Sequence, residues 1–172
     1  MDAVYFHFWK YRLHTHPAST YEHKLHTIRA VAFPFIIYLL YAHNFAGIYL
    51  WFGAFVVIAD LIVLGLDVHA EFESRENLGG LPRAEYLIHI FANGFHFASI
   101  ALMLSIKPAS AWSFAAQPLL AWSYPQFTIS VANVLITGGI LAALSHIWYW
   151  WKYRGLDGRP LDQQSSTAPM RK

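Results

Sequence analysis

Residues 47–66, GIYLWFGAFVVIADLIVLGL, decide the fold of this chain. An apolar run of this length can cross a lipid bilayer as a single helix. It contains one charged side chain, Asp60, and leads into the acidic stretch DVHAE at residues 67–71. Because a carboxylate inside a membrane is costly, it normally faces the interior of a helical bundle. We therefore interpret the rest of the chain around this helix.

Two stripes of ionisable residues have matching spacings in two of the apolar runs. At about 100° per residue, residues four and seven apart lie on one side of a helix. The first stripe consists of Asp60, Asp67 and Glu71, and the second of Glu85, His89 and His96. On antiparallel helices these spacings place the two stripes at the same depths. The sequence therefore predicts that the stripes face each other, with His26 and His146 at nearby levels.

The composition excludes several classes of protein. Of the 172 residues, 56% are hydrophobic and only 13% are charged, which is too little charge to cover a soluble domain. The net charge of +2 is not gathered on one helix or tail, so a nucleic-acid partner is not expected. The chain has no cysteine, which excludes disulfides, thiolate metal ligands and thiol catalysis.

Four apolar runs predict an all-α integral-membrane protein, a bundle of four transmembrane helices. The expected spans are about 28–46, 47–66, 84–106 and 129–151. The first helix should start near Tyr21 and bend at Pro34. Gly138 and Gly139 predict a close contact with another helix. Residues 1–154 are expected to form one membrane domain, followed by a disordered cytoplasmic tail at 155–172.

Two segments outside the spans have an interfacial composition. The N-terminal segment mixes aromatic, basic and histidine residues, which suits the headgroup region of a bilayer. Residues 109–127 are rich in aromatic side chains but contain Pro118 and Pro125. We expect this stretch to be a broken aromatic loop between the third and fourth spans, with a short helix over the mouth of the bundle.

The basic residues predict the orientation of the chain. Lys and Arg gather in the N-terminal segment, in the loop between the second and third spans, and in the C-terminal tail. The positive-inside rule then places both termini in the cytoplasm, in a membrane that we expect to be the bacterial inner membrane. Arg29, Arg75 and Arg83 are interpreted as anchors of the same kind, with lipid phosphates as their partners.

The facing stripes favour a metal site of one or two ions in the cytoplasmic half of the bundle. The candidate ligands are carboxylates and imidazoles from all four spans: Asp60, Asp67, Glu71, Glu85, His89, His96, His146 and His26. Oxygen and nitrogen ligands suit iron or zinc. The site would make the chain a membrane enzyme acting on a lipid-like substrate, by oxidation with iron or hydrolysis with zinc. The spacing Glu85-x-x-x-His89 differs from the Glu-x-x-His of ferritin-type sites.

Three alternatives remain open at this stage. The same stripe predicts a proton or metal-ion transporter or conduit. This interpretation ranks second because a conduit needs polar groups through the whole bundle, and the half away from the cytoplasm has only His43, Asn44 and Asn133. A b-type haem between His89 and His146 ranks third. The polar groups would otherwise serve only to hold the helices together by hydrogen bonds. The lipid bilayer is the expected partner, together with a further copy or another subunit.

Overall fold

A computed structural model describes residues 20–76 and 83–153, without the side chains of Thr20, residues 71–76, Glu85 and Tyr153. The predicted N-terminal interfacial segment and the predicted tail at 155–172 lie outside the described residues. The side chains of two predicted site residues, Glu71 and Glu85, also lie outside them.

The described residues form four long helices, as the sequence predicts. All four are long and apolar enough to cross a membrane. They are α1 (Thr20–Ile37), α2 (Gly47–Glu76), α3 (Arg83–Ser105) and α4 (Gln126–Tyr153). A π-helical turn, η4 (Tyr38–Ala42), continues α1, and a short 3-10 helix, η5 (Ala109–Trp112), follows α3. The predicted helix start near Tyr21 and the third and fourth predicted spans agree with these bounds to within three residues. The first helix, with η4, ends at Ala42 and not at residue 46, and α2 continues to Glu76, ten residues beyond the predicted span.

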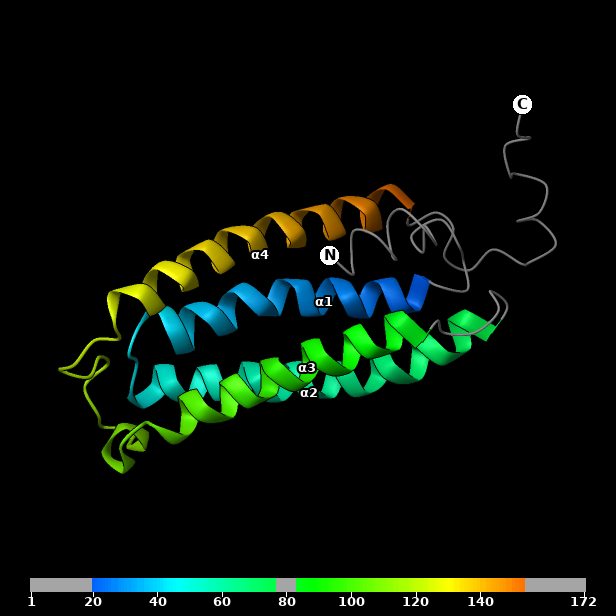
Figure 1. Cartoon of the computed structure of the whole chain (residues 1–172). Coiled ribbons are helices and arrows are strands. Elements are labelled where there is room, and N and C mark those ends of the chain that lie inside the picture. The colour runs from blue at the N-terminus through cyan, green and yellow to red at the C-terminus, as the bar shows by residue number, and fades with distance from the viewer. Residues whose placement is uncertain (1–19, 77–82, 154–172) are drawn as a thin grey trace.

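Helix α1 occupies the centre of the bundle. Figure 1 shows it running between α4 on one side and α2 and α3 on the other. The membrane-length segment that contains α1, Tyr21–Ala42, is 39% buried inside the protein, whereas the corresponding segment of α3, Tyr86–Ser105, is 6% buried. Most of the surface of α3 is therefore left for lipid or for another protein. We call the end where α1 begins and α4 finishes the termini end, and the opposite end the turn end.

The turn end is closed by a tight reversal between η4 and α2. Gly47 has a φ of +59°, and a Cβ on it would meet the backbone oxygen of Ala116 at 2.9 Å. Glycine tolerates both the positive φ and the close approach. The amide of Ala46 donates to the oxygen of Pro118 (3.0 Å), and the amide of Leu120 donates to the oxygen of Asn44 (3.0 Å). The loop after α3 thus packs on this reversal, and it contains the short helix that the sequence predicts.

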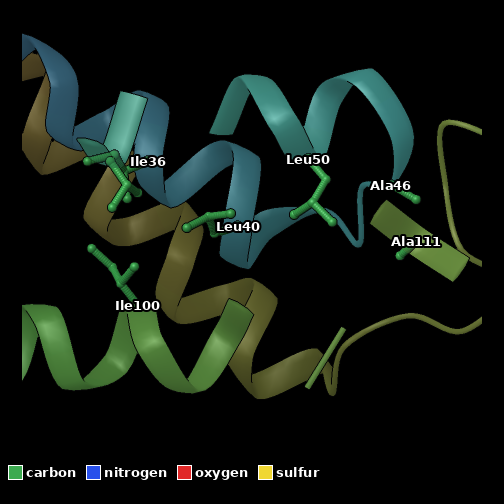
Figure 2. Packing of buried hydrophobic residues seen from close by; sticks show 7 residues of the cluster. Ile36, Leu40, Ala46, Leu50, Ile100 and Ala111 are labelled. Atoms are coloured by element: carbon green, nitrogen blue, oxygen red, sulfur yellow. The ribbon is translucent and has the colours of Figure 1, made fainter. Parts of the chain in front are cut away.

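The apolar core lies toward the turn end and joins the first three long helices to the loop. Figure 2 shows Ile36 and Leu40 from α1 and η4 facing Leu50 of α2 and Ile100 of α3, with Ala46 and Ala111 nearby. These side chains are at most 3% exposed. Burying an aliphatic side chain of this size stabilises a fold by about 1.5–3 kcal/mol in water, and close packing takes over this role between helices in lipid.

Helix α4 packs on α1 through a glycine. A Cβ on Gly139 would lie 2.9 Å from Cδ1 of Phe33 and 3.4 Å from Cδ of Pro34. Gly138, the neighbouring residue, has nothing within 4 Å of the same position. The predicted close contact at the glycine pair is confirmed, and Gly139 alone makes it.

Candidate functional site

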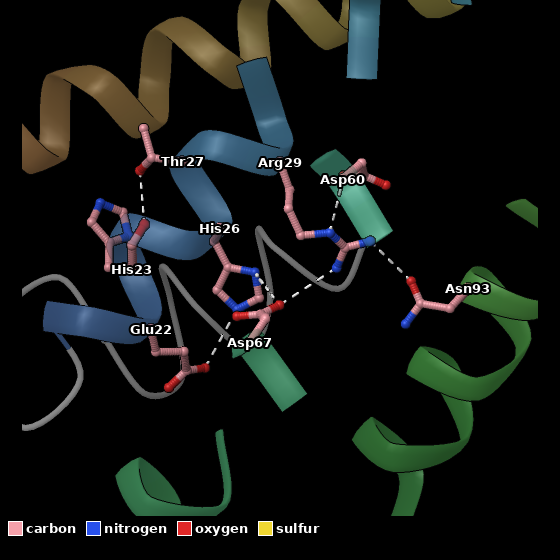
Figure 3. A network of polar contacts seen from close by, with 8 residues as sticks. All are labelled: Glu22, His23, His26, Thr27, Arg29, Asp60, Asp67 and Asn93. Carbon is pink, nitrogen blue, oxygen red and sulfur yellow. Dashed lines mark hydrogen bonds and ion pairs between the residues drawn. The ribbon is translucent and has the colours of Figure 1, made fainter. Parts of the chain in front are cut away.

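Arg29 of α1 is the centre of a buried polar network near the termini end. Its Nε donates to Oδ1 of Asp60 (3.3 Å), its Nη1 to Oδ2 of Asp67 (3.4 Å) and its Nη2 to Oδ1 of Asn93 (3.1 Å). Figure 3 shows the guanidinium lying between the two carboxylates of α2 and the amide of α3. The aspartate side chains are only 4% and 7% exposed, and that of Arg29 is 20% exposed. One cation therefore binds three groups on two other helices.

His26 lies one helical turn before Arg29 and contacts two carboxylates. Its Nε2 is 3.4 Å from Oε1 of Glu22, and its Nδ1 is 3.4 Å from Oδ2 of Asp67. The Glu22 side chain is fully buried. Figure 3 shows the imidazole between the two acids, with one ring nitrogen turned to each. Because the two carboxylates lie on opposite sides of the ring, this arrangement is a bridge and not a convergent set of ligands.

His96 of α3 extends the network on the other side of Arg29. Its Nε2 lies 3.5 Å from Oδ2 of Asp60, the carboxylate oxygen that Arg29 does not bind. The ring of His96 also lies beside Phe33, with centroids 6.0 Å apart. Contacts of 3.3–3.5 Å thus connect Glu22, His26, Asp67, Arg29, Asp60 and His96 in that order.

Two hydroxyl groups continue the polar line toward the turn end. The Ser99 hydroxyl donates to the backbone oxygen of His96 (2.8 Å). The Tyr41 hydroxyl, from η4, donates to Oγ of Ser99 (2.8 Å). Both residues are partly buried. Polar groups therefore extend beyond the half of the bundle to which the sequence assigned them.

The fourth helix contributes a histidine pair. His146 of α4 and His23 of α1 are both buried, and their rings stack with centroids 5.3 Å apart and an interplanar angle of 18°. His146 therefore faces α1. His89, the other residue of the predicted haem pair, is half-buried on α3. Figure 1 shows α1 between α3, which carries His89, and α4, which carries His146.

The structure brings together four of the predicted site residues, Asp60, Asp67, His96 and His26, around Arg29. The interpretation of Arg29 as a lipid anchor is wrong, because its side chain points into the bundle. Within residues 20–70 and 83–152, no group of three or more His, Asp or Glu side chains is arranged to hold a metal ion. The Arg29 guanidinium lies between Asp60 and Asp67, in the position that a metal ion bound by both carboxylates would occupy.

Sequence reasoning missed Glu22 and Arg29 as members of the site. Glu22, His26 and Arg29 are spaced four and three apart, so they lie on one stripe of α1. The same rule that found the stripes of α2 and α3 identifies this third stripe. Asn93, which accepts a hydrogen bond from Arg29, is the third member that the two stripes did not include.

Comparison with known proteins gave no match: no family model, no curated protein and no solved structure is similar to this chain.

Proposed function

We propose that the chain is an integral-membrane protein that carries protons along the network from Glu22 to His96, either as a gated conduit or in coupled transport. The observation that carries this proposal is the unbroken series of contacts of 3.3–3.5 Å between ionisable side chains of three helices. Carboxylates and imidazoles inside transmembrane helices are the usual groups of proton relays.

The network has two parts that can exchange protons. Glu22, His26 and Asp67 form one part, in which an imidazole lies between two carboxylates. Asp60 and His96 form the other part, a carboxylate beside an imidazole. Histidine accepts and releases a proton near neutral pH, so each part contains a suitable carrier.

Arg29 separates the two parts and cannot itself release a proton at physiological pH. Its positive charge repels a proton that approaches from either side, as fixed cations do in proton-excluding pores. We therefore propose that Arg29 acts as the gate, and that its guanidinium, which contacts Asp67 and Asp60 at the same time, must move away from them before a proton passes from one carboxylate to the other. The hydroxyls of Ser99 and Tyr41 offer the next polar groups on the way to the turn end.

The proposed location is a membrane with the termini end in the cytoplasm. Four helices of sufficient length and apolar composition support insertion. The distribution of Lys and Arg supports the orientation. In this orientation Glu22 receives protons from the cytoplasm and His96 lies deeper in the bilayer.

Replacing His26 by glutamine is expected to slow proton flux by about tenfold or more, because the amide cannot carry a proton between Glu22 and Asp67. The measurement uses purified protein in liposomes that enclose a pH-sensitive dye, with a potassium gradient and valinomycin to drive protons inward. Asp60→Asn should have a similar effect, since it removes the carrier on the other side of Arg29.

His43→Gln is the matched control. His43 is exposed at the turn end, and its ring contacts are with Tyr38 and Phe45. Flux through this variant should equal that of the unmodified chain. If the unmodified chain conducts no faster than empty liposomes under either direction of the potential, the proposal is refuted.

A metal centre is the second candidate function. Glu22, His26 and Asp67 supply buried oxygen and nitrogen donors from two helices, but the His26 ring lies between the two carboxylates, so these side chains would have to rearrange before they converge on one ion. Glu71 follows Asp67 by one helical turn on α2. Bound iron would supply oxidation chemistry and zinc hydrolysis, acting on a lipid-like substrate.

Elemental analysis of purified protein tests this candidate directly. A metal site predicts stoichiometric iron or zinc in the unmodified chain and its loss in a His26→Ala, Asp67→Asn double variant. His43→Ala should retain the metal. Protein that is free of both metals after purification without chelators, and that takes up neither on titration, would remove the metal centre from consideration.

A further inference from the structure

Lys107 lies buried at the turn end, directly after α3. It is 5% exposed. Its Nζ donates to Oδ1 of Asn44 (2.5 Å) and to the backbone oxygen of Phe45 (3.2 Å), and it lies 5.2 Å from the centre of the Tyr124 ring. An ammonium group has three protons to donate, and these two hydrogen bonds use two of them.

The positive charge of Lys107 has no acidic partner among the residues that the structure describes. All of its contacts are with neutral groups. Moving an ammonium ion out of water without an opposite charge is unfavourable, even after the protein relaxes. A buried cation of this kind therefore indicates that a negative charge is supplied from elsewhere.

Tyr124, whose ring lies next to the Lys107 ammonium group, has a polar group without a partner among the described residues. Tyr124 is 5% exposed, and its hydroxyl is buried with no hydrogen-bond partner in the described structure. Buried hydroxyls are almost always hydrogen-bonded, so an exception needs an explanation. The ammonium group therefore lies over the face of the Tyr124 ring with one proton outside these two hydrogen bonds, and the hydroxyl of the same ring has no acceptor among the described residues.

We propose that Lys107 and Tyr124 bind a small monovalent anion of the size of chloride at the turn end of the bundle. A halide accepts hydrogen bonds from any direction, which suits donors that come from the two ends of the loop between α3 and α4. Asn44 is also 5% exposed, so these three residues leave little room for a large anion. The site is separate from the network around Arg29, and it does not depend on the function proposed for that network.

The pH dependence of the anion effect follows from the lysine. Burial lowers the pKa of Lys107 to about 8, and it raises the pKa of Tyr124 to about 12. Without an anion, the charged lysine destabilises the folded state, and this penalty disappears as the pH rises from about 8 toward the unfolded pKa of about 10.4. Tyr124 stays neutral over this range. Tyr41 and Tyr124 are the titratable groups that face the site from η4 and from the loop. The ring of His43 instead packs edge-on against Tyr38 and at a tilt against Phe45.

The test compares thermal unfolding of the full chain in sodium chloride and in sodium gluconate at equal ionic strength. At pH 7, chloride should raise the Tm by about 3 °C or more, because a ligand of the folded state stabilises it by mass action. The difference between the two salts should shrink above pH 9, where the lysine loses its charge. Equal ionic strength removes general screening as an explanation.

Three variants separate this site from other effects of chloride. Lys107→Met should abolish the difference between the salts, Lys107→Arg should retain it, and Tyr124→Phe, which keeps the ring, should reduce it. Lys152→Met, an exposed lysine at the other end of α4, is the control and should leave the difference intact. The proposal is overturned by equal Tm values in chloride and gluconate for the unmodified chain, or by an undiminished chloride effect in both Lys107→Met and Tyr124→Phe.

Discussion

Arg29→Met should destabilise the protein by about 3–5 kcal/mol, which is the usual effect of removing one partner from a buried ion pair. The variant leaves Asp60 and Asp67 in the bundle with no guanidinium, and it frees the amide oxygen of Asn93. It also breaks the polar connection from α1 to both α2 and α3. Reversible unfolding in mixed detergent micelles, followed by circular dichroism, measures the change in free energy.

Arg83→Met is the matched control, because it removes the same charge from an exposed position at the start of α3. It should change the free energy of unfolding by no more than about 0.5 kcal/mol. Adding Asp60→Asn and Asp67→Asn to Arg29→Met should recover more than half of the loss, since both side chains that faced the guanidinium are then neutral amides. Equal stability of Arg29→Met and Arg83→Met would show that the guanidinium does not hold the helices together.

Gly139→Leu is expected to have the second large effect, a loss of about 2–3 kcal/mol from overpacking. A side chain there must displace Phe33 and Pro34, whose nearest atoms are 2.9 Å and 3.4 Å from the position of a Cβ. The displacement moves α4 away from α1. It should also separate the stacked rings of His23 and His146. Unfolding under the same conditions measures the loss.

Gly138→Leu provides a control at the next residue. Nothing lies within 4 Å of its Cβ position, so the new side chain faces outward from the bundle. Both substitutions remove a glycine from the interior of α4, and they therefore gain the same helix propensity. The difference between the two variants isolates the α1–α4 contact. Equal stability would mean that α4 does not depend on close approach at Gly139.

The sequence predicts the helices well because length and apolar composition determine them. The apolar run that begins at Gly47 predicts α2, and the acidic stretch that follows it from Asp67 belongs to the same helix in the structure. The stripe rule also predicts the pairing of Asp60 with His96, which lie 3.5 Å apart. These features depend on one helix, or on two helices of opposite direction, and the sequence contains that information.

The arrangement of the helices around α1 could not be predicted in the same way. Each span is apolar on almost every side, as exposed residues such as Phe55 (65%), Phe95 (74%) and Val134 (72%) show, so the pattern does not mark the face that packs on protein. Arg29 was misinterpreted for a related reason. An arginine near the start of a span commonly anchors in the headgroups, and only its register with Glu22 and His26 distinguishes an inward position.

The central position of α1 has a consequence for how the chain assembles. Among the described helices, α1 precedes the other three in the chain, and it also contacts the fourth, since Phe33 and His23 of α1 meet Gly139 and His146 of α4. Contacts between distant parts of a chain form late, because the intervening segment must first be ordered. During synthesis the carboxylates of α2, the next helix along the chain, can therefore neutralise Arg29 before α4 is made.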